Sequence, residues 1–337
     1  MRVPVGARPA RRTALVIWAV AGALLLLAGC GIGGAPPVVR PPAPSATSPV
    51  AATAPDGRGA VRPLPAPTGC TSMIRSVDSM DLTLATLAPG AKVCLLGDLS
   101  GAQLTVRQSG TAQAPIQILG DGQTVVHGVD VQGSYVTISG VNALNPNAPG
   151  ISLYGDNITL ENSTSISPRG DDGDALRFWG NNITIRHNTM RDTRNLNGAH
   201  ADCMQTFATD EDHPASQHIM IDSNRCEQIN NTCLIAEGPN SLAGDGSGVG
   251  ATTDITFTNN FCDNMAGEAL QIDDVQNMTI TNNEIAGPGL DHAFALQNMS
   301  TGAKVSGNKL NPNIRYEVGL DQSSAPGYQG PEPTGHP

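Results

Sequence analysis

Short strand-like segments recur along this chain at a nearly constant interval, and this repeat constrains the fold more than any other feature. The segments "YVTISGVNA", "NITLENSTS", "NITIRHNTM" and "DITFTNNFC" each contain alternating β-branched residues and reach a turn that contains Asn. A second set, which includes "GISLYG", "ALRFWG", "CMQTFA" and "ALQIDD", lies between them. The interval is 22 residues from Thr137 to Thr159 and 23 residues from Thr256 to Thr279. The repeat therefore predicts a solenoid of stacked parallel β turns.

Alignment of the repeats brings residues of one kind to the same position in successive turns. One such column consists of asparagines: Asn188, Asn224, Asn260, Asn283 and Asn308. Stacked Asn side chains can hydrogen-bond from turn to turn, and Asn tolerates the left-handed backbone of a bend. Two residues later comes a column that we expect to face the interior: Met190, Cys226, Cys262, Ile285 and Leu310.

These repeats resemble the right-handed parallel β-helix of the pectate-lyase-like superfamily. The segments "LAPGAKVCLLGDLSG" and "SGTAQAPIQILGDG" resemble the N-terminal cap and the first turns of that superfamily, and the resemblance covers about residues 70–319. It implies an all-β fold, a right-handed parallel β-helix with an N-terminal cap, over residues 70–320. It implies no particular activity, because a fold does not determine a function.

The N-terminal residues have the order of an export signal. A basic start precedes an apolar run from Ala14 to Ala28, which is short for a membrane span, and the run ends in "LAGC". This order resembles a bacterial lipobox, so we expect residues 1–29 to be a signal peptide and Cys30 to be lipidated. Residues 30–69, rich in Pro and Ala, are expected to be a tether. The expected location is the cell membrane, with the lipid-anchored protein on its extracytoplasmic face.

Charge and composition bound the partners. Removal of residues 1–29 takes away four arginines and no acids, so the net charge moves from −11 to −15. A protein this acidic lacks the basic footprint that nucleic acids and anionic lipids require. The polar C-terminal residues 321–337 are expected to be a disordered tail. We expect a monomer whose partner is a polysaccharide or a cell-wall glycan.

The six cysteines other than Cys30 favour disulfides, because an even number is typical of an oxidising compartment. Adjacent turns of a β-solenoid lie about 4.8 Å apart, within the range that disulfides need. Cysteines that share a column are therefore expected to pair, with free buried thiols as the alternative. The expected pairs are Cys203 with Cys233, Cys226 with Cys262, and, in the cap, Cys70 with Cys94.

One face of the middle turns gathers polar side chains. In our alignment the residues of this face with carboxylate, guanidinium or amide groups are Asp174, Arg177, Asp202, Gln205, Glu237, Glu268, Gln271 and Asp273. His200 lies on the loop that leads to this face, and Trp179 and Phe207 lie beside it. Long connections within residues 184–204, 204–220 and 234–256 surround the same turns. Together these features predict a sugar-binding groove, with ordinary surface decoration as the alternative.

The resemblance implies a lyase mechanism for such a groove. In uronate lyases of this superfamily, acidic side chains hold Ca²⁺ against the uronate carboxylate, and a Lys or Arg takes the C5 proton. Asp171, Asp172 and Asp174 are oxygen ligands of the kind that Ca²⁺ prefers, with a solvated turn as the alternative. The three lysines lie far from the middle turns, which leaves Arg177 or His200 as the base. Histidine has the more suitable intrinsic pKa, whereas arginine would need a strong perturbation.

In the lyase interpretation, Asp174 and Asp202 hold Ca²⁺ or orient the substrate. Gln205, Glu237, Gln271 and Asp273 line the subsites. We therefore expect a polysaccharide lyase that cleaves a uronate-containing glycan.

Two other functions stay open. A glycoside hydrolase could use paired carboxylates, because Glu237 and Asp273, like Asp174 and Asp202, lie about 5 Å apart in neighbouring turns. The chain lacks the Gly-His-Gly and Arg-Ile-Lys motifs of polygalacturonases, which counts against that group. A non-catalytic module that binds glycan or cell wall would need the same aromatic and amide side chains.

Overall fold

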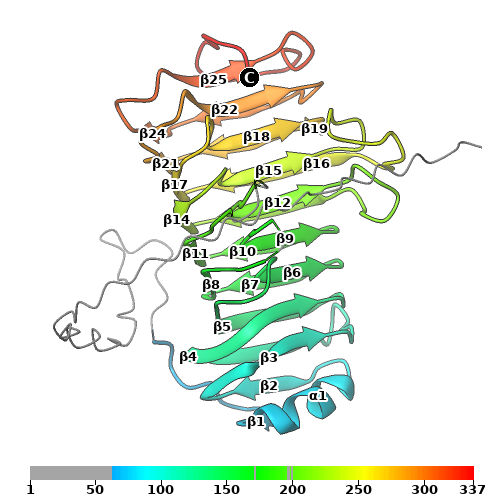
Figure 1. The fold of residues 1–337 in the computed structure, drawn as a ribbon. Coiled ribbons are helices and arrows are strands. Elements are labelled where there is room, and N and C mark those ends of the chain that lie inside the picture. Colours follow the sequence, from blue (N-terminus) through cyan, green and yellow to red (C-terminus); the bar gives the residue numbers. More distant parts are fainter. Residues whose placement is uncertain (1–62, 171, 196–197, 199) are drawn as a thin grey trace, which may run out of the picture. The chain divides into compact units, whose positions relative to one another are not determined.

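The computed structural model describes residues 63–170, 172–195, 198 and 200–337. These residues form parallel β-strands and one short helix, α1 (Val77–Ala85). Figure 1 shows the strands stacked in chain order, from β1 beside α1 to β25. The strands are β1 (Ser72–Ile74), β2 (Lys92–Leu95), β3 (Asp98–Val106), β4 (Ile116–Val131), β5 (Val136–Leu144), β6 (Ile151–Tyr154), β7 (Ile158–Glu161), β8 (Thr164–Ile166), β9 (Leu176–Trp179), β10 (Thr184–Arg186), β11 (Thr189–Arg191), β12 (Met204–Phe207), β13 (Gln217–Asp222), β14 (Arg225–Ile229), β15 (Leu234–Glu237), β16 (Thr252–Thr258), β17 (Phe261–Asn264), β18 (Leu270–Asp273), β19 (Val275–Gln276), β20 (Thr279–Thr281), β21 (Glu284–Ile285), β22 (His292–Gln297), β23 (Lys304–Ser306), β24 (Lys309–Leu310) and β25 (Tyr316–Leu320).

The strands pair in parallel with the corresponding strands of the next turn, which is the parallel solenoid that the repeat predicted and the right-handed β-helix that the resemblance implied. One row, here called the groove face, runs through β6, β9, β12, β15, β18 and β22. A second row runs through β7, β10, β13 and β16, and a third through β8, β11, β14 and β17. In the groove face, Met204 lies beside Leu176 and Leu234, and all three are fully buried. Period-2 alternation therefore separates the core from the outer face, as predicted.

The predicted asparagine column forms a ladder inside the bends. The Asn188, Asn224 and Asn260 backbone amides each donate to the side-chain oxygen of the next asparagine, at 3.0, 2.8 and 2.8 Å. The ladder thus satisfies backbone groups that are buried in every turn. The left-handed residue is the one before each ladder position, such as Asn259 (φ 56°), and not the ladder asparagine itself.

The six cysteines within the described residues all lie in disulfides, but only the cap pair, Cys70 with Cys94, is as predicted. The other bridges join Cys203 to Cys226 and Cys233 to Cys262. The two columns themselves are correct, since Cys226 lies in register with Cys262 and Cys203 precedes the paired strand β12 as Cys233 precedes β15. Side chains of one column point in the same direction, whereas the two columns meet across the interior. Each bridge therefore closes one turn and does not join two turns.

The two ends of the described region are covered. Met80 and Leu84 of α1 are buried beneath the first turns. Residues 321–337 are ordered against the last turns: Gln329 pairs with Lys304, and Gly335 pairs with Gly319. The prediction of a disordered tail is wrong, because these residues supply backbone partners to strands that would otherwise end the stack unpaired.

The N-terminal predictions fall largely outside the described residues. The signal peptide (residues 1–29), Cys30 and most of the tether lie there. The last tether residues, from 63, run along the β-helix, and the Leu64 amide donates to the Asp121 carbonyl at 2.9 Å. Among the described residues, no helix combines the length and apolar character that a membrane crossing would need.

Candidate active site

The groove face has the register that the alignment predicted. Arg177, Gln205, Ile235 and Gln271 form one column of outward residues. Another column, at the strand ends, consists of Tyr154, Trp179, Phe207, Glu237 and Asp273. Asp174 and Asp202 come just before β9 and β12. The predicted columns are confirmed, but the side chains within them differ strongly in solvent exposure, and the exposure determines which of them can contact a ligand.

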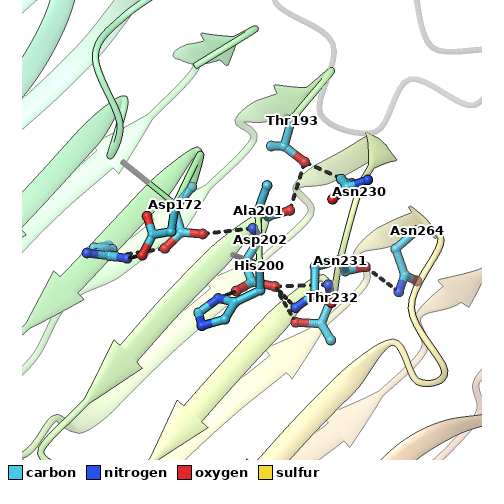
Figure 2. A network of polar contacts seen from close by, with 11 residues as sticks. Asp172, Thr193, His200, Ala201, Asp202, Asn230, Asn231, Thr232 and Asn264 are labelled. Carbon is cyan, nitrogen blue, oxygen red and sulfur yellow. Dashed lines mark hydrogen bonds and ion pairs between the residues drawn. The ribbon is translucent and has the colours of Figure 1, made fainter. Parts of the chain in front are cut away.

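Asp202 is fully buried and orients His200. Its Oδ1 accepts hydrogen bonds from the Asn231 side chain (2.8 Å) and from the backbone amide and hydroxyl of Thr232 (2.9 and 2.7 Å). Its Oδ2 lies 2.8 Å from Nδ1 of His200, and Figure 2 shows this arrangement. Because the carboxylate is acceptor-only when ionised, Nδ1 donates, and Nε2 of the half-exposed ring makes none of the described hydrogen bonds.

A further layer of contacts holds the loop that carries His200. The hydroxyl of Thr193 donates to the Ala201 carbonyl at 2.9 Å and accepts from the Asn230 amide at 2.9 Å. Asn264 donates to the carbonyl of Asn231 at 2.8 Å, as Figure 2 also shows. Residues from several turns therefore position the loop.

His200 is charged near neutral pH. The hydrogen bond with Asp202 raises its pKa to about 9, although partial burial works in the opposite direction. The charges of Asp202, Asp174 and Asp172 act in the same sense as the hydrogen bond. With 46% of its side chain exposed, the imidazolium remains accessible. At pH 7 its ring therefore carries a proton and a positive charge, which suits an acid better than the base expected from the sequence.

Arg177 is tied to two carboxylates. Its Nε donates to Oδ2 of Asp174 at 2.7 Å, and its NH2 group contacts Asp172. Burial alone would lower the pKa of Arg177, but the charges and hydrogen bonds of both aspartates outweigh burial and raise it. Arg177 is therefore also a poor base. Asp174 is fully buried, and desolvation together with the charge of Asp202 raises its pKa to about 7, despite Arg177.

The carboxylates of Asp172 and Asp174 and the imidazole of His200 form an acidic group that could hold a metal ion. Their ligand atoms lie within 4.8 Å of one another. Asp171, the third predicted calcium ligand, lies outside the described residues.

This donor set does not suit Ca²⁺, which takes about six to eight oxygen ligands. Arg177 already binds both carboxylates, and the third donor is a nitrogen. Oδ1 of Asp174 also accepts the Asp202 amide at 2.8 Å, so its oxygens are committed. The Oδ1 atom of Asp172, buried without a hydrogen-bond partner in the described part of the chain, is the one free oxygen.

Glu237 combines burial with freedom from hydrogen bonds. It is 8% exposed, and no hydrogen bond from the described residues reaches its carboxylate. Desolvation, and then the charge of Asp273, raise its pKa to about 7, while the charge of His200 lowers it. A carboxylate with this pKa is matched to proton transfer at neutral pH. From the sequence, Glu237 was expected to line a subsite or to pair with Asp273 in a hydrolase, and its raised pKa was missed, although its neighbours Phe207 and Ile235 could have indicated it.

Asp273 is the partner that a paired-carboxylate hydrolase would require, but it is occupied. Only 1% exposed, it accepts from the Leu242 amide (3.1 Å) and from the side chains of Gln297 (3.1 Å) and Asn298 (3.0 Å). It anchors the 238–251 connection. The other predicted pair, Asp174 and Asp202, is fully buried. Neither pair presents two free carboxylates to the groove.

The remaining predicted residues differ in accessibility. Gln205 is 5% exposed, and its Oε1 has no hydrogen-bond partner among the described residues, so it can meet a ligand. Gln271 is half-buried and lies two turns further along the same column, beyond Ile235. Half-buried Glu268 lies two turns from Asp202, and burial, with a smaller effect of Asp202, raises its pKa.

The aromatic residues form one cluster at the strand ends. The Trp179 indole N–H donates to the Phe207 carbonyl at 3.0 Å, and the two rings meet edge to face at 5.2 Å. His213 packs against both, at 4.9 and 4.5 Å, and Tyr154 lies 6.2 Å from Trp179. Since Trp179 is only 6% exposed, the accessible ring is that of Tyr154, at 41%. Tyr154 and His213 were not predicted as site residues, although Tyr154 shares the column of Trp179.

Comparisons with known proteins agree with this fold. The chain belongs to the family described as "Right handed beta helix region", which matches residues 127–314. Among solved structures, pectate lyase Pel9A is 14% identical with a TM-score of 0.50, covering 77% of this chain and 80% of that one. An alginate lyase from Paenibacillus sp. str. FPU-7 is 15% identical with a TM-score of 0.45, covering 77% and 99%.

The PL6 family alginate lyase AlyGC is 12% identical with a TM-score of 0.47, and the match covers 75% of this chain. This chain spans only 41% of AlyGC. The comparison with curated proteins found no match. At 14% identity the likeness to pectate lyase Pel9A shows the parallel β-helix fold alone, and the activity has to be argued from the site.

Proposed function

We propose that the groove face is the active site of a polysaccharide lyase that cleaves a uronate-containing glycan by β-elimination. One observation carries the proposal. An accessible imidazolium, His200 on buried Asp202, lies near enough to Glu237 for its charge to act on that carboxylate, and burial has moved the pKa of Glu237 towards neutral. With a pKa of about 7 for Glu237 and about 9 for His200, the carboxylate can be ionised while the imidazole keeps its proton, which suits the two groups to opposite roles in proton transfer.

The roles follow from the protonation states. The ionised fraction of Glu237 takes the C5 proton, the C4–O bond breaks, and a C4=C5 double bond forms. His200 gives its Nε2 proton to the leaving oxygen, and solvent exchange then restores both groups. Arg177, beside Phe207, binds its two aspartates through Nε and one NH2 group, and its other NH2 group donates to the uronate carboxylate. Gln205 offers its unpartnered amide oxygen to a substrate hydroxyl.

The experiment measures the ultraviolet absorbance of unsaturated uronates with pectate, alginate, hyaluronan and gellan as substrates. Glu237→Gln and His200→Gln should each lower kcat by at least about 100-fold, the usual contribution of one acid or base. His218→Gln is the matched control, since that histidine is 59% exposed in β13. If both groove variants retain the wild-type rate on a cleaved polymer, the assignment is wrong.

No step of this mechanism passes through a metal ion. The sequence resemblance implied Ca²⁺, but the occupied carboxylates and the guanidinium of Arg177 favour metal-independent elimination. Activity that disappears with a chelator and returns with added Ca²⁺ would contradict this part of the proposal.

A glycan-binding module without activity is the second candidate. The exposed ring of Tyr154 beside the groove favours it, because binding needs an aromatic surface but no acid or base. Binding without unsaturated products or new reducing ends on any polymer would support the module over both lyase and hydrolase.

We also propose that the chain is a lipoprotein anchored through Cys30 on the extracytoplasmic face of the membrane. Three disulfides support an oxidising compartment. Metabolic labelling with a radioactive fatty acid should mark the protein, and Cys30→Ser should abolish the label and release the protein from membranes. Equal labelling of both would refute lipidation at this residue.

A further inference from the structure

We propose that a cavity beside Tyr154 is a second sugar subsite, and that it accepts an uncharged sugar next to the uronate. This inference deepens the proposed function and rests on it. The cavity has a volume of about 400 Å³ and lies at the ends of β6 and β9. Its lining includes Tyr154, Asn181, Glu211, Asp212, His213 and Val249.

The cavity offers ring and apolar surface to a sugar. Tyr154, the last residue of β6, is 41% exposed, and Val249, in the 238–251 connection, is 68% exposed. Both line the same cavity, so a sugar can place one face on the tyrosine ring and an edge against the valine. Trp179 lies beside the tyrosine ring and is almost fully buried, which makes the floor rigid.

His213 is held in place rather than free to move. The Asp210 carboxylate lies 2.7 Å from Nδ1 of His213 and accepts its backbone amide at 3.0 Å. The ring then packs 4.5 Å from Phe207. Both longer connections, residues 208–216 and 238–251, contribute lining residues, which gives the predicted insertions a specific role.

Phe207 joins the cavity to the candidate active site. Its ring contacts His213 on the cavity side, while the Arg177 guanidinium lies 5.6 Å from the ring centroid. From Leu176 to Trp179 the strand spans about 10 Å. A glycan that places its uronate near Arg177 and His200 can therefore continue along the strand direction into the cavity.

The charge of the lining decides which sugar fits. Glu211 and Asp212 contribute carboxylates, and among the described lining residues there is no Lys or Arg. A uronate would be repelled there, because like charges destabilise each other when brought together. Asn181 supplies an acceptor: its Oδ1 is buried without a partner in the described region, while its Nδ2 donates to Asp156 at 3.2 Å. Hydroxyl or amide N–H groups of an uncharged sugar match this acceptor.

The substrate class that follows is a heteroglycan in which uronates alternate with uncharged sugars, rather than a polymer of uronates alone. Binding can be read from Trp179 fluorescence in the full chain with Trp18→Phe, which leaves Trp179 as its one tryptophan. The probes are hyaluronan and gellan oligosaccharides, compared with oligogalacturonate and oligomannuronate.

The test compares Tyr154→Ala with Tyr154→Phe, which keeps the ring and removes only the hydroxyl that donates to the Asp212 carbonyl at 3.5 Å. We expect at least one mixed oligosaccharide to change the emission. Tyr154→Ala should weaken its binding about tenfold, and Tyr154→Phe should leave it nearly unchanged. On a polymer that is cleaved, Tyr154→Ala should raise KM without lowering kcat.

Two results would overturn the inference: homouronan oligomers that bind as tightly as mixed ones, or mixed oligomers whose binding is unaffected by Tyr154→Ala. Its failure is separable from that of the proposed function. Loss of kcat in Glu237→Gln with no effect of Tyr154→Ala removes the subsite alone. A Tyr154-dependent emission change without cleavage of any polymer removes the lyase and leaves the subsite.

Discussion

Replacement of Glu237 by glutamine should stabilise the protein, and the gain should grow with pH. The ionised carboxylate is buried in β15 near Asp273 and has no hydrogen-bond donor among the described residues. Glutamine has nearly the same shape but no charge to desolvate. The substitution that should remove catalysis should therefore increase the stability of the protein. A residue with a purely structural role would not show this combination of lost activity and gained stability.

The magnitude follows from the pKa of Glu237, which is raised from 4.5 to about 7. Because the folded pKa is raised, the stability that this carboxyl contributes is fully present below pH 4.5 and is lost as the pH rises through 7. A shift of this size corresponds to about 3 kcal/mol, and residual solvent contact reduces the expected difference to about 2 kcal/mol. The free energy of unfolding of Glu237→Gln, minus that of the wild type, should therefore be about 2 kcal/mol larger at pH 8 than at pH 4.5.

Urea unfolding followed by circular dichroism, with disulfides kept oxidised, measures this difference. Glu284→Gln, at a partly exposed position in β21, controls for the substitution itself. Since the charge of His200 lowers the pKa of Glu237, the gain at pH 8 should be larger in a His200→Gln background. A difference between Glu237→Gln and wild type that is the same at both pH values would refute the reasoning.

Further predictions concern the ladder, the disulfides and the metal. Asn260→Ala should lower the free energy of unfolding in urea by about 3 kcal/mol, because it leaves buried polar groups of the turns on either side without their hydrogen-bond partner. Asn308→Ala, at the partly exposed end of the ladder, should lower it by about 1 kcal/mol. Peptide mapping without reduction should recover Cys203 linked to Cys226. A peptide that links Cys203 to Cys233, its neighbour in the column, would contradict the fold of that turn. A chelator should leave the rate of uronate elimination unchanged, and a tenfold loss would restore the case for Ca²⁺.

The repeat predicted the parallel β-solenoid and its columns, and the family resemblance added that it is a right-handed β-helix. In-register parallel stacking fixes which residues of successive turns align, so alignment of "ALRFWG" with "CMQTFA" correctly places Arg177 beside Gln205. The disulfide pairing failed because a column identifies a face but not the column opposite it. Cys203 meets Cys226 only through the closure of a whole turn, which local pattern does not describe.

Burial at the site was the other property that the pattern could not supply. Period-2 alternation ends where a strand ends, so it did not distinguish buried Asp202 from accessible His200, two residues away. The occupation of Asp273 by the Leu242 amide depends on a connection that folds back over the strand end. The burial of Asp202 makes it a residue that positions His200. The occupation of Asp273 leaves Glu237 as the carboxylate without a hydrogen-bond donor among the described residues.

The most direct measurement is the pH dependence of unsaturated uronate formation on a cleaved glycan, for wild type, Glu237→Gln and His200→Gln. The account predicts a bell-shaped kcat/KM profile for the wild type, rising as Glu237 ionises near pH 7 and falling as His200 loses its proton near pH 9. The rising limb should be absent in Glu237→Gln and the falling limb absent in His200→Gln, each with a lower maximum. Unsaturated products that form with the same profile in all three proteins would contradict the assignment of this groove as the active site.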